Sequence, residues 1–190
     1  MSSINVQFEG DGIKRFTALS RQLGDGTAAR IYSRAINDTG KVAATATGRA
    51  LAKQTGLSGR TGAKAVKKQD RASASNLTFA INLTGGQIRV KYFKPRETAS
   101  GVSAAPRNNR QVFVGSFMRA GFWPDRVDKP GWNRQIFYLS GKKFSVAKTD
   151  VYIPVEAVTG DTAQTFDQSK DKLDTRVTHY LKRLERGALS

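Results

Sequence analysis

An uninterrupted run of helix-forming residues near the N-terminus, 27–53, constrains the fold more than any other feature of this sequence. Placed at 100° per residue, its apolar side chains fall on one stripe. That stripe contains Ala28, Ile31, Ala35, Val42, Ala46 and Ala50. Because alanine dominates it, we expect other elements to pack closely against the helix. Gly40 and Gly48 each weaken the helix by up to ~1 kcal/mol relative to alanine, which is consistent with a bend near Gly40.

Downstream of this helix the apolar periodicity changes to two residues, which is typical of half-buried strands. Residues 76–84 and 87–93 both alternate, and Gly85 and Gly86 between them predict a hairpin with a tight turn. Further strands are expected in three segments, 111–117, 134–139 and 150–155. An amphipathic C-terminal helix is expected over 162–186.

This order of elements predicts an α+β fold. It comprises the long N-terminal helix, an antiparallel sheet of about four strands with helices on one side, and the C-terminal helix. We expect one such domain over 27–187. Residues 1–26 would form an N-terminal extension with a short helix at 12–23, which carries several apolar residues on one face.

The charge of the chain indicates its class of partner. The net charge is +17, and residues 61–150 alone carry seventeen basic and five acidic side chains. Such a field attracts anionic partners. No apolar run approaches the ~18 residues of a transmembrane helix, and the N-terminus lacks a signal-peptide pattern, so we expect no membrane partner. We expect a protein made in the cytoplasm, unless it leaves within a particle.

A basic stretch with three glycines, residues 56–71, is the first candidate binding segment. Its glycines, at positions 56, 59 and 62, suggest a flexible segment that orders against a partner. If the stretch is helical, Lys64, Lys67, Lys68 and Arg71 share a face. The full set of candidate contacts to DNA or to an acidic protein is Arg60, Lys64, Lys67, Lys68, Arg71, Arg89 and Lys91. Few aromatic residues lie near them to stack on bases, so non-specific DNA contact or an acidic neighbouring subunit is favoured over sequence-specific binding.

Two further segments are candidates for a subunit interface. Residues 94–110 have little apolar content and two prolines, so we expect an extended basic loop, or arm, that orders against a neighbour. Residues 121–132 concentrate aromatic side chains, which either anchor an interface or cap the sheet as a small satellite core. The candidate interface residues are Phe117, Phe122, Trp123, Trp132, Lys94, Arg96, Arg107 and Arg110.

No arrangement of residues in the sequence indicates an enzyme. There is no cysteine, and the single histidine, His179, falls opposite the apolar face of the last helix. Asp167, Asp171 and Asp174 share one side of that helix but lack the glycine-bearing loop of a calcium site. The segment 140–143 lacks the glycine spacing of a phosphate-binding loop. We therefore expect no catalytic activity, no metal and no cofactor.

The layout nevertheless resembles one known family, the minor tail protein Z family of lambda-like phages. The resemblance covers roughly residues 27–187. It rests on the opening helix "RIYSRAINDTGKVAATATGRALAK", the step Gly115-Ser116-Phe117, the turn "GKKFSV" at 141–146, and "IPVEAV" at 153–158. The first 25 residues, Asp125 and Asp128 do not match.

The resemblance implies a structural role in a virion. Members are tail completion or neck proteins that act when the tail is joined to the DNA-filled head, and related neck proteins form rings around the DNA channel. It therefore implies a homo-oligomeric ring, hexameric as is common among related neck proteins, with neighbours such as the tail terminator or the connector and with non-specific contact to genomic DNA. The alternative is a free, non-specific nucleic-acid-binding protein.

Overall fold

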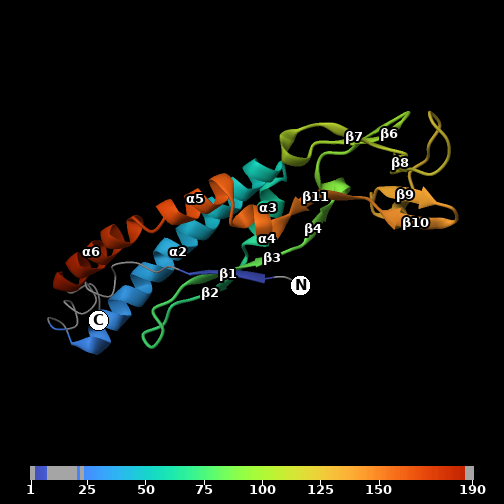
Figure 1. Cartoon of the computed structure of the whole chain (residues 1–190). Helices are drawn as coiled ribbons and strands as arrows, with labels where there is room; N and C mark the ends of the chain where they lie inside the picture. The colour runs from blue at the N-terminus through green and yellow to red at the C-terminus, as the bar shows by residue number, and fades with distance from the viewer. Residues whose placement is uncertain (1–2, 8–20, 22–23, 187–190) are drawn as a thin grey trace.

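A computed structural model describes residues 3–7, 21 and 24–186 of the chain. It confirms the α+β class, with a long N-terminal helix, small antiparallel sheets and C-terminal helices. The molecule is elongated, with α6 at one end and the sheets that contain β5–β10 at the other (Figure 1). We call this second end, residues 94–148, the distal end. The short helix expected at 12–23 lies almost entirely outside the described residues.

The long helix α2 (Asp25–Thr55) runs along most of the molecule and ends at Gly56, whose left-handed conformation (φ 78°) closes the last turn. Its first half buries Ala28, Ile31 and Ala35 as expected, whereas Val42 is exposed. In the second half the buried track is formed instead by Ala43, Ala44, Thr47 and Leu51. The track shifts because different elements, first α6 and then α5 and α3, cover the helix along its length.

Two glycines of α2 allow other elements to approach its backbone. A Cβ atom added at Gly40 would lie 2.4 Å from the ring of Phe79, which is fully buried against the helix there. Gly48 faces Gly62 of α3 (Gly59–Ala65). A Cβ atom added at Gly62 would lie 2.3 Å from the carbonyl oxygen of Gly48. These glycines therefore serve packing.

The strands form four small antiparallel sheets, so the prediction of one sheet of about four strands is wrong. The first has the order β1 (Ser3–Gln7), β3 (Ala80–Thr84), β2 (Lys68–Asp70), and the second pairs β11 (Lys148–Tyr152) with β4 (Gln87–Arg89). The third has the order β5 (Arg96–Thr98), β6 (Gly101–Ala104), β7 (Gln111–Val114). The fourth has the order β10 (Lys143–Val146), β9 (Phe137–Ser140), β8 (Ser116–Phe117).

The hairpin expected across Gly85 and Gly86 is also wrong. The chain passes from one sheet into another there, because β3 pairs with β1 and β2 whereas β4 pairs with β11. Ile153 packs against Gly85, where an added Cβ would lie 3.1 Å from its side chain. The glycines thus accommodate a close contact between distant segments.

The arm expected at 94–110 is folded against the rest of the chain. Its residues form the β5–β6 hairpin and the short 3-10 helix η2 (Pro106–Asn108). All four residues of β6 are buried, and Val102 and Ala104 are fully inaccessible. The prediction of an extended, partner-ordered loop is therefore wrong, because Val102, Ala104 and Pro106 are buried within the fold.

Three helices end the chain where one was expected. The segment predicted as extended, 150–155, divides into β11 and α4 (Ile153–Ala157), whose first turn accommodates Pro154. The predicted helix over 162–186 divides into α5 (Gly160–Gln168) and α6 (Lys172–Glu185). Both lie along α2 (Figure 1), and the Tyr180 hydroxyl donates a hydrogen bond to Asp38, which raises the pKa of Tyr180. No helix within the described ranges is long and apolar enough to cross a bilayer.

Candidate functional site

The basic stretch of 56–71 is folded and does not present its charges on one helical face. Ser58 caps α3 by accepting a hydrogen bond from the Thr61 backbone amide, and the helix already ends at Ala65. Lys67 and Arg71 therefore lie outside the helix, on either side of β2, which contains Lys68. The side chains of Arg60, Lys64, Lys67 and Arg71 are exposed and make no ion pair with any described residue. They remain free to meet an anionic surface.

Arg89 and Lys91 belong to a different place and have partners within the chain. With its amide oriented for hydrogen bonding, Gln135 accepts from Arg89 Nη1 at 2.6 Å and from Lys91 Nζ at 3.0 Å. Lys91 also reaches the carbonyl oxygen of Asn133 at 3.4 Å. The two cations thus hold the 133–135 segment against β4.

Arg107 takes part in an internal ion-pair network. Its guanidinium donates to Glu156 Oε1 from Nη2 at 2.7 Å and from Nε at 3.0 Å, and it also pairs with Asp150. These bonds, to Asp150 first, raise the pKa of Arg107. Gln54 completes the network by donating to Glu156 Oε2 at 2.9 Å and accepting from the backbone amide of Thr162 at 3.0 Å.

The network joins the end of α2 to η2, β11, α4 and α5. The sequence alone did not indicate it, since its members are spread over more than a hundred residues. Arg110 is likewise bonded within the chain, to Ser103 and to the Lys94 carbonyl oxygen. The structure thus gives no support for an interface role at Arg107 or Arg110, whereas the side chains of Lys94 and Arg96 are exposed.

The aromatic residues of the distal end divide into two groups. Phe117, Trp132, Phe137 and Phe144 form a cluster with ring centroids 5.3 to 6.2 Å apart. The satellite core considered for this region is therefore present around Trp132. Phe122, by contrast, is 92% exposed, and Trp123 is about half exposed. These two side chains remain candidates for an interface.

The aromatic cluster, which we define as Phe117, Trp132, Phe137 and Phe144, covers one face of the β8–β9–β10 sheet. Phe117 pairs with Phe137 across β8 and β9, and Phe144 pairs with Leu139 across β9 and β10. Side chains of alternate strand residues share a face, so Leu139 lies on the same face as Phe137. The opposite face turns to the core, where Ser116 is buried and Tyr138 packs. An antiparallel sheet commonly leaves its outer face polar, and here that face is apolar.

No family model, no curated protein and no solved structure matches this chain.

Glu97 is a key residue of the distal end that sequence reasoning missed. Its side chain is only 4% exposed, and it pairs with Arg126 Nη1 at 2.6 Å. The same carboxylate oxygen accepts from the backbone amides of Met118 and Arg119, at 2.9 and 3.3 Å. Glu97 thus attaches the aromatic turn to the β5–β6 hairpin. The one signal in the sequence was a lone acid within a strongly basic stretch.

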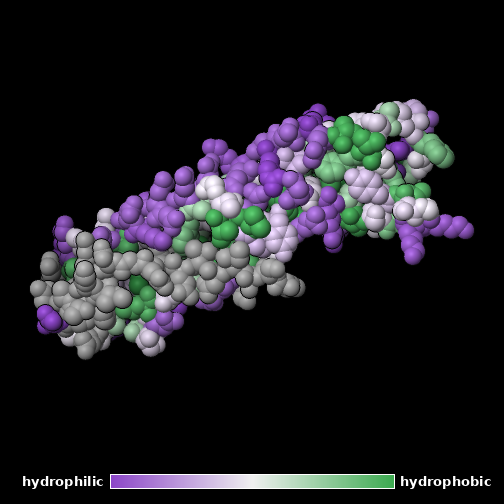
Figure 2. All heavy atoms as spheres, viewed as in Figure 1, coloured by the Kyte–Doolittle hydropathy of each residue, from purple (hydrophilic) through white to green (hydrophobic). Residues whose placement is uncertain are grey.

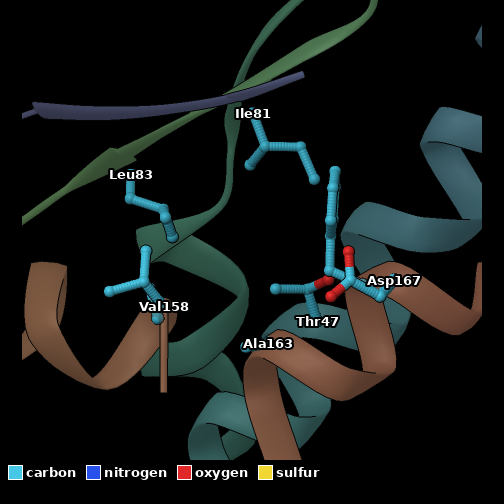
Figure 3. A pocket seen from close by; sticks show the side chains of 8 residues that line it. Thr47, Ile81, Leu83, Val158, Ala163 and Asp167 are labelled. Carbon is cyan, nitrogen blue, oxygen red and sulfur yellow. The ribbon is translucent and has the colours of Figure 1, made fainter. Parts of the chain in front are cut away.

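A cavity of about 210 Å³ lies between α2, β3 and α5 (Figure 3). Ile81 and Leu83 project into it from β3, and Thr47, Ala163 and Phe166 line it from the helices. The carboxylate of Asp167 at its edge pairs with Lys170. The lining offers no convergent set of polar groups, and the described residues contain no group of acids or histidine that could hold a metal ion. This cavity is therefore an apolar recess without the groups that chemistry would need.

The cavity leads to a prediction for stability. Thr47 is buried, and its hydroxyl has no hydrogen-bond partner among the described atoms. The isosteric change Thr47→Val should raise the free energy of unfolding by about 1 kcal/mol, because a buried unpaired hydroxyl is replaced by a methyl group. Thermal unfolding should show a melting temperature about 2–4 °C higher.

The matched control is Thr55→Val in the same helix. The Thr55 hydroxyl is equally buried but donates to the Leu51 carbonyl oxygen at 2.6 Å. This variant should show no gain. Equal shifts for the two variants would contradict the assignment of an unpaired hydroxyl at Thr47.

Proposed function

We propose that this protein is a structural subunit of a tailed phage virion, a tail completion or neck component that acts in head–tail joining. The observation that supports an assembly role is the apolar outer face of the β8–β9–β10 sheet on a strongly basic subunit. Leu139 and Phe144 on this face are 56% and 59% exposed. Exposed apolar faces of this kind mark interaction sites.

The extent of the surface also favours a subunit of an assembly. The chain exposes 11773 Å². A compact monomer of 20.7 kDa is expected to expose about 8,900 Å². The excess agrees with the elongated shape in Figure 1 and leaves room for several contacts of about 800 Å² per partner.

The family resemblance supplies the specific setting. A tail completion protein would close as a homo-oligomeric ring, hexameric by analogy, around the DNA channel. Its neighbours would be proteins such as the tail terminator or the connector, and it would reside in the neck or tail of the virion after assembly in the host cytoplasm. In this setting the exposed cations Arg60, Lys64, Lys67 and Arg71 would meet channel DNA or an acidic subunit.

The experiment is complementation of a phage that lacks this gene. The variant Arg60→Glu/Lys64→Glu/Lys67→Glu/Arg71→Glu should fold with a nearly unchanged melting temperature, because exposed unpaired charges contribute little to stability. It should fail to yield infectious particles, with heads and tails left unjoined in electron micrographs.

A control variant separates this site from net charge. Arg30, Arg34, Arg49 and Lys53 are exposed on α2, and their change to glutamate alters the net charge equally. This control should complement. If the wild-type protein never enters particles, or if the variant with Arg60, Lys64, Lys67 and Arg71 changed to glutamate complements fully, the proposal is wrong.

The same four cations also fit a second candidate, a free non-specific nucleic-acid-binding protein. A monomer with this role would bind duplex DNA with a steep dependence on salt. For each tenfold rise in salt concentration, the logarithm of the binding constant would fall by about 0.9 per phosphate contact. Mass photometry distinguishes the two. A discrete multiple of the 20.7 kDa subunit favours the ring, and a monomer that saturates DNA favours the alternative.

A further inference from the structure

The apolar outer face of the β8–β9–β10 sheet is exposed at Leu139 and Phe144, which is typical of a surface that binds another molecule. We define this outer face as the aromatic cluster together with Leu139. It is built on paired strands, and Figure 2 shows hydrophobic residues exposed at this end of the molecule. No charged residue lies on this face of the three strands, since Lys143 and Phe144 point to opposite sides of β10.

The surroundings of the outer face are strongly positive. Residues 94–148 carry eleven basic and three acidic side chains, a net charge of +8. Two of the three acids are already paired, Glu97 with Arg126 and Asp128 with Arg119. Lys129, Arg134 and Lys142 flank the cluster in sequence, are exposed, and form no ion pair with any residue that the structure describes.

A second copy of this chain does not fit such a rim. A face-to-face contact would oppose two segments of +8. The other segments supply no excess of negative charge, because residues 1–60 carry a net charge of +5 and residues 151–190 are neutral overall. Like charges brought together across an interface cost binding energy. The occupant must therefore carry the negative charge that this chain lacks.

The arrangement of the rings argues against stacked bases. Trp132 and Phe137 meet at an interplanar angle of 71°, and Phe117 and Phe144 at 68°, so the rings pack edge to face with one another. A platform for single-stranded nucleic acid offers open ring faces to successive bases. Here the rings contact one another within the cluster. The exposed apolar surface is that of Leu139 and of part of Phe144.

We propose that the outer face, with its basic rim, is the docking surface for a different protein whose contact region is apolar at its centre and acidic at its margin. This inference deepens the proposed function and rests on it for the setting, a joint between this subunit and an acidic virion protein. The apolar centre would supply the affinity, and the complementary margins would supply the orientation and fast association.

The chemistry of the partner can be read from a random peptide library. Peptides of about 16 residues displayed on yeast are selected on the wild-type full-length chain. We expect the enriched peptides to be rich in Asp and Glu and to contain apolar residues. Binding should fall at least about tenfold with Leu139→Lys and also with Lys129→Glu/Lys142→Glu, a pair that leaves the aromatic cluster intact.

The matched control is Val155→Lys on α4. Val155 is 55% exposed, like Leu139, but lies outside the distal end. It should retain full binding. Circular dichroism and melting temperature show whether each variant is folded, and because the charge pair touches no core residue, the test does not depend on Leu139→Lys alone.

Four results would overturn the proposal. They are no enriched peptides, enriched peptides without an acidic excess, equal loss in the Val155→Lys control, and self-association of the wild-type chain that Leu139→Lys abolishes. An oligothymidine or vesicles containing phosphatidylserine that bind through Leu139, with no acidic peptides enriched, would assign the face to nucleic acid or to membrane. The two proposals can also fail separately. If acidic peptides bind to the outer face but the protein never enters phage particles, this inference stands and the proposed function is refuted.

Discussion

Replacing Glu97 with alanine is expected to lower the free energy of unfolding of the distal end by about 3–5 kcal/mol. The change leaves Arg126, whose side chain is only 16% exposed, without its counter-charge, and removes the acceptor for the backbone amides of Met118 and Arg119. Removing one partner of a buried ion pair is costly because the remaining charge stays buried and unpaired. Hydrogen exchange should show a large loss of protection at 118–127.

The control for this prediction is Asp128→Ala in the same turn. Asp128 accepts from Arg119 at 2.9 Å, but its side chain is 79% exposed. Exposed pairs contribute about 0–1 kcal/mol, so the variant should unfold nearly as the wild type does. Similar effects of the two substitutions would show that charge, and not burial, determines the stability of the turn.

Replacing Gly62 with alanine should destabilise the protein by about 1–3 kcal/mol. The new Cβ would lie 2.3 Å from the Gly48 carbonyl oxygen and 2.9 Å from the Ala52 Cβ, and both groups belong to α2, which cannot yield locally. The helices α2 and α3 would have to separate. Thermal unfolding should show a melting temperature lower by about 2–12 °C.

Gly59→Ala is the opposite case three residues earlier in the same helix. An added Cβ at Gly59 meets no atom within 4 Å. Alanine is the better helix former, so this variant should gain up to ~1 kcal/mol. If both alanine variants behave alike, the close approach of α3 to α2 is not as the structure has it.

Local patterns predicted the helices well and the sheets poorly. The expected helix at 27–53 is the core of α2, because helical periodicity and glycine termination are encoded within a few residues. Each predicted strand segment contains a strand, but the bounds differ, since residues 90–92 form a 3-10 helix, and the partners were not predicted. β4 pairs with β11, which lies about sixty residues later in the chain. The local sequence of either segment does not indicate this partner. Strand pairing in this fold depends on contacts between segments that are far apart in the chain.

The candidate site could be predicted only in part. The exposed cations of α3 follow from composition, and the aromatic segment was recognised as either an interface or a satellite core. The satellite core is present around Trp132, whereas an interface at the exposed Phe122 stays a prediction. The buried acids Glu97 and Glu156 could not be found, because a carboxylate acquires its role from distant cations that only the fold brings to it.

The position of α2 also bears on how the chain is made. Gln54 accepts a hydrogen bond from Thr162, which is made 108 residues later. Asp38 accepts one from Tyr180, which is made 142 residues later. At about 5–20 residues per second, the ribosome needs roughly 5–30 s to supply them. During this interval the face of α2 that later receives α5 and α6 is uncovered on the nascent chain. Because alanine and threonine make up much of that face, it offers little apolar area for aggregation or for chaperones to hold.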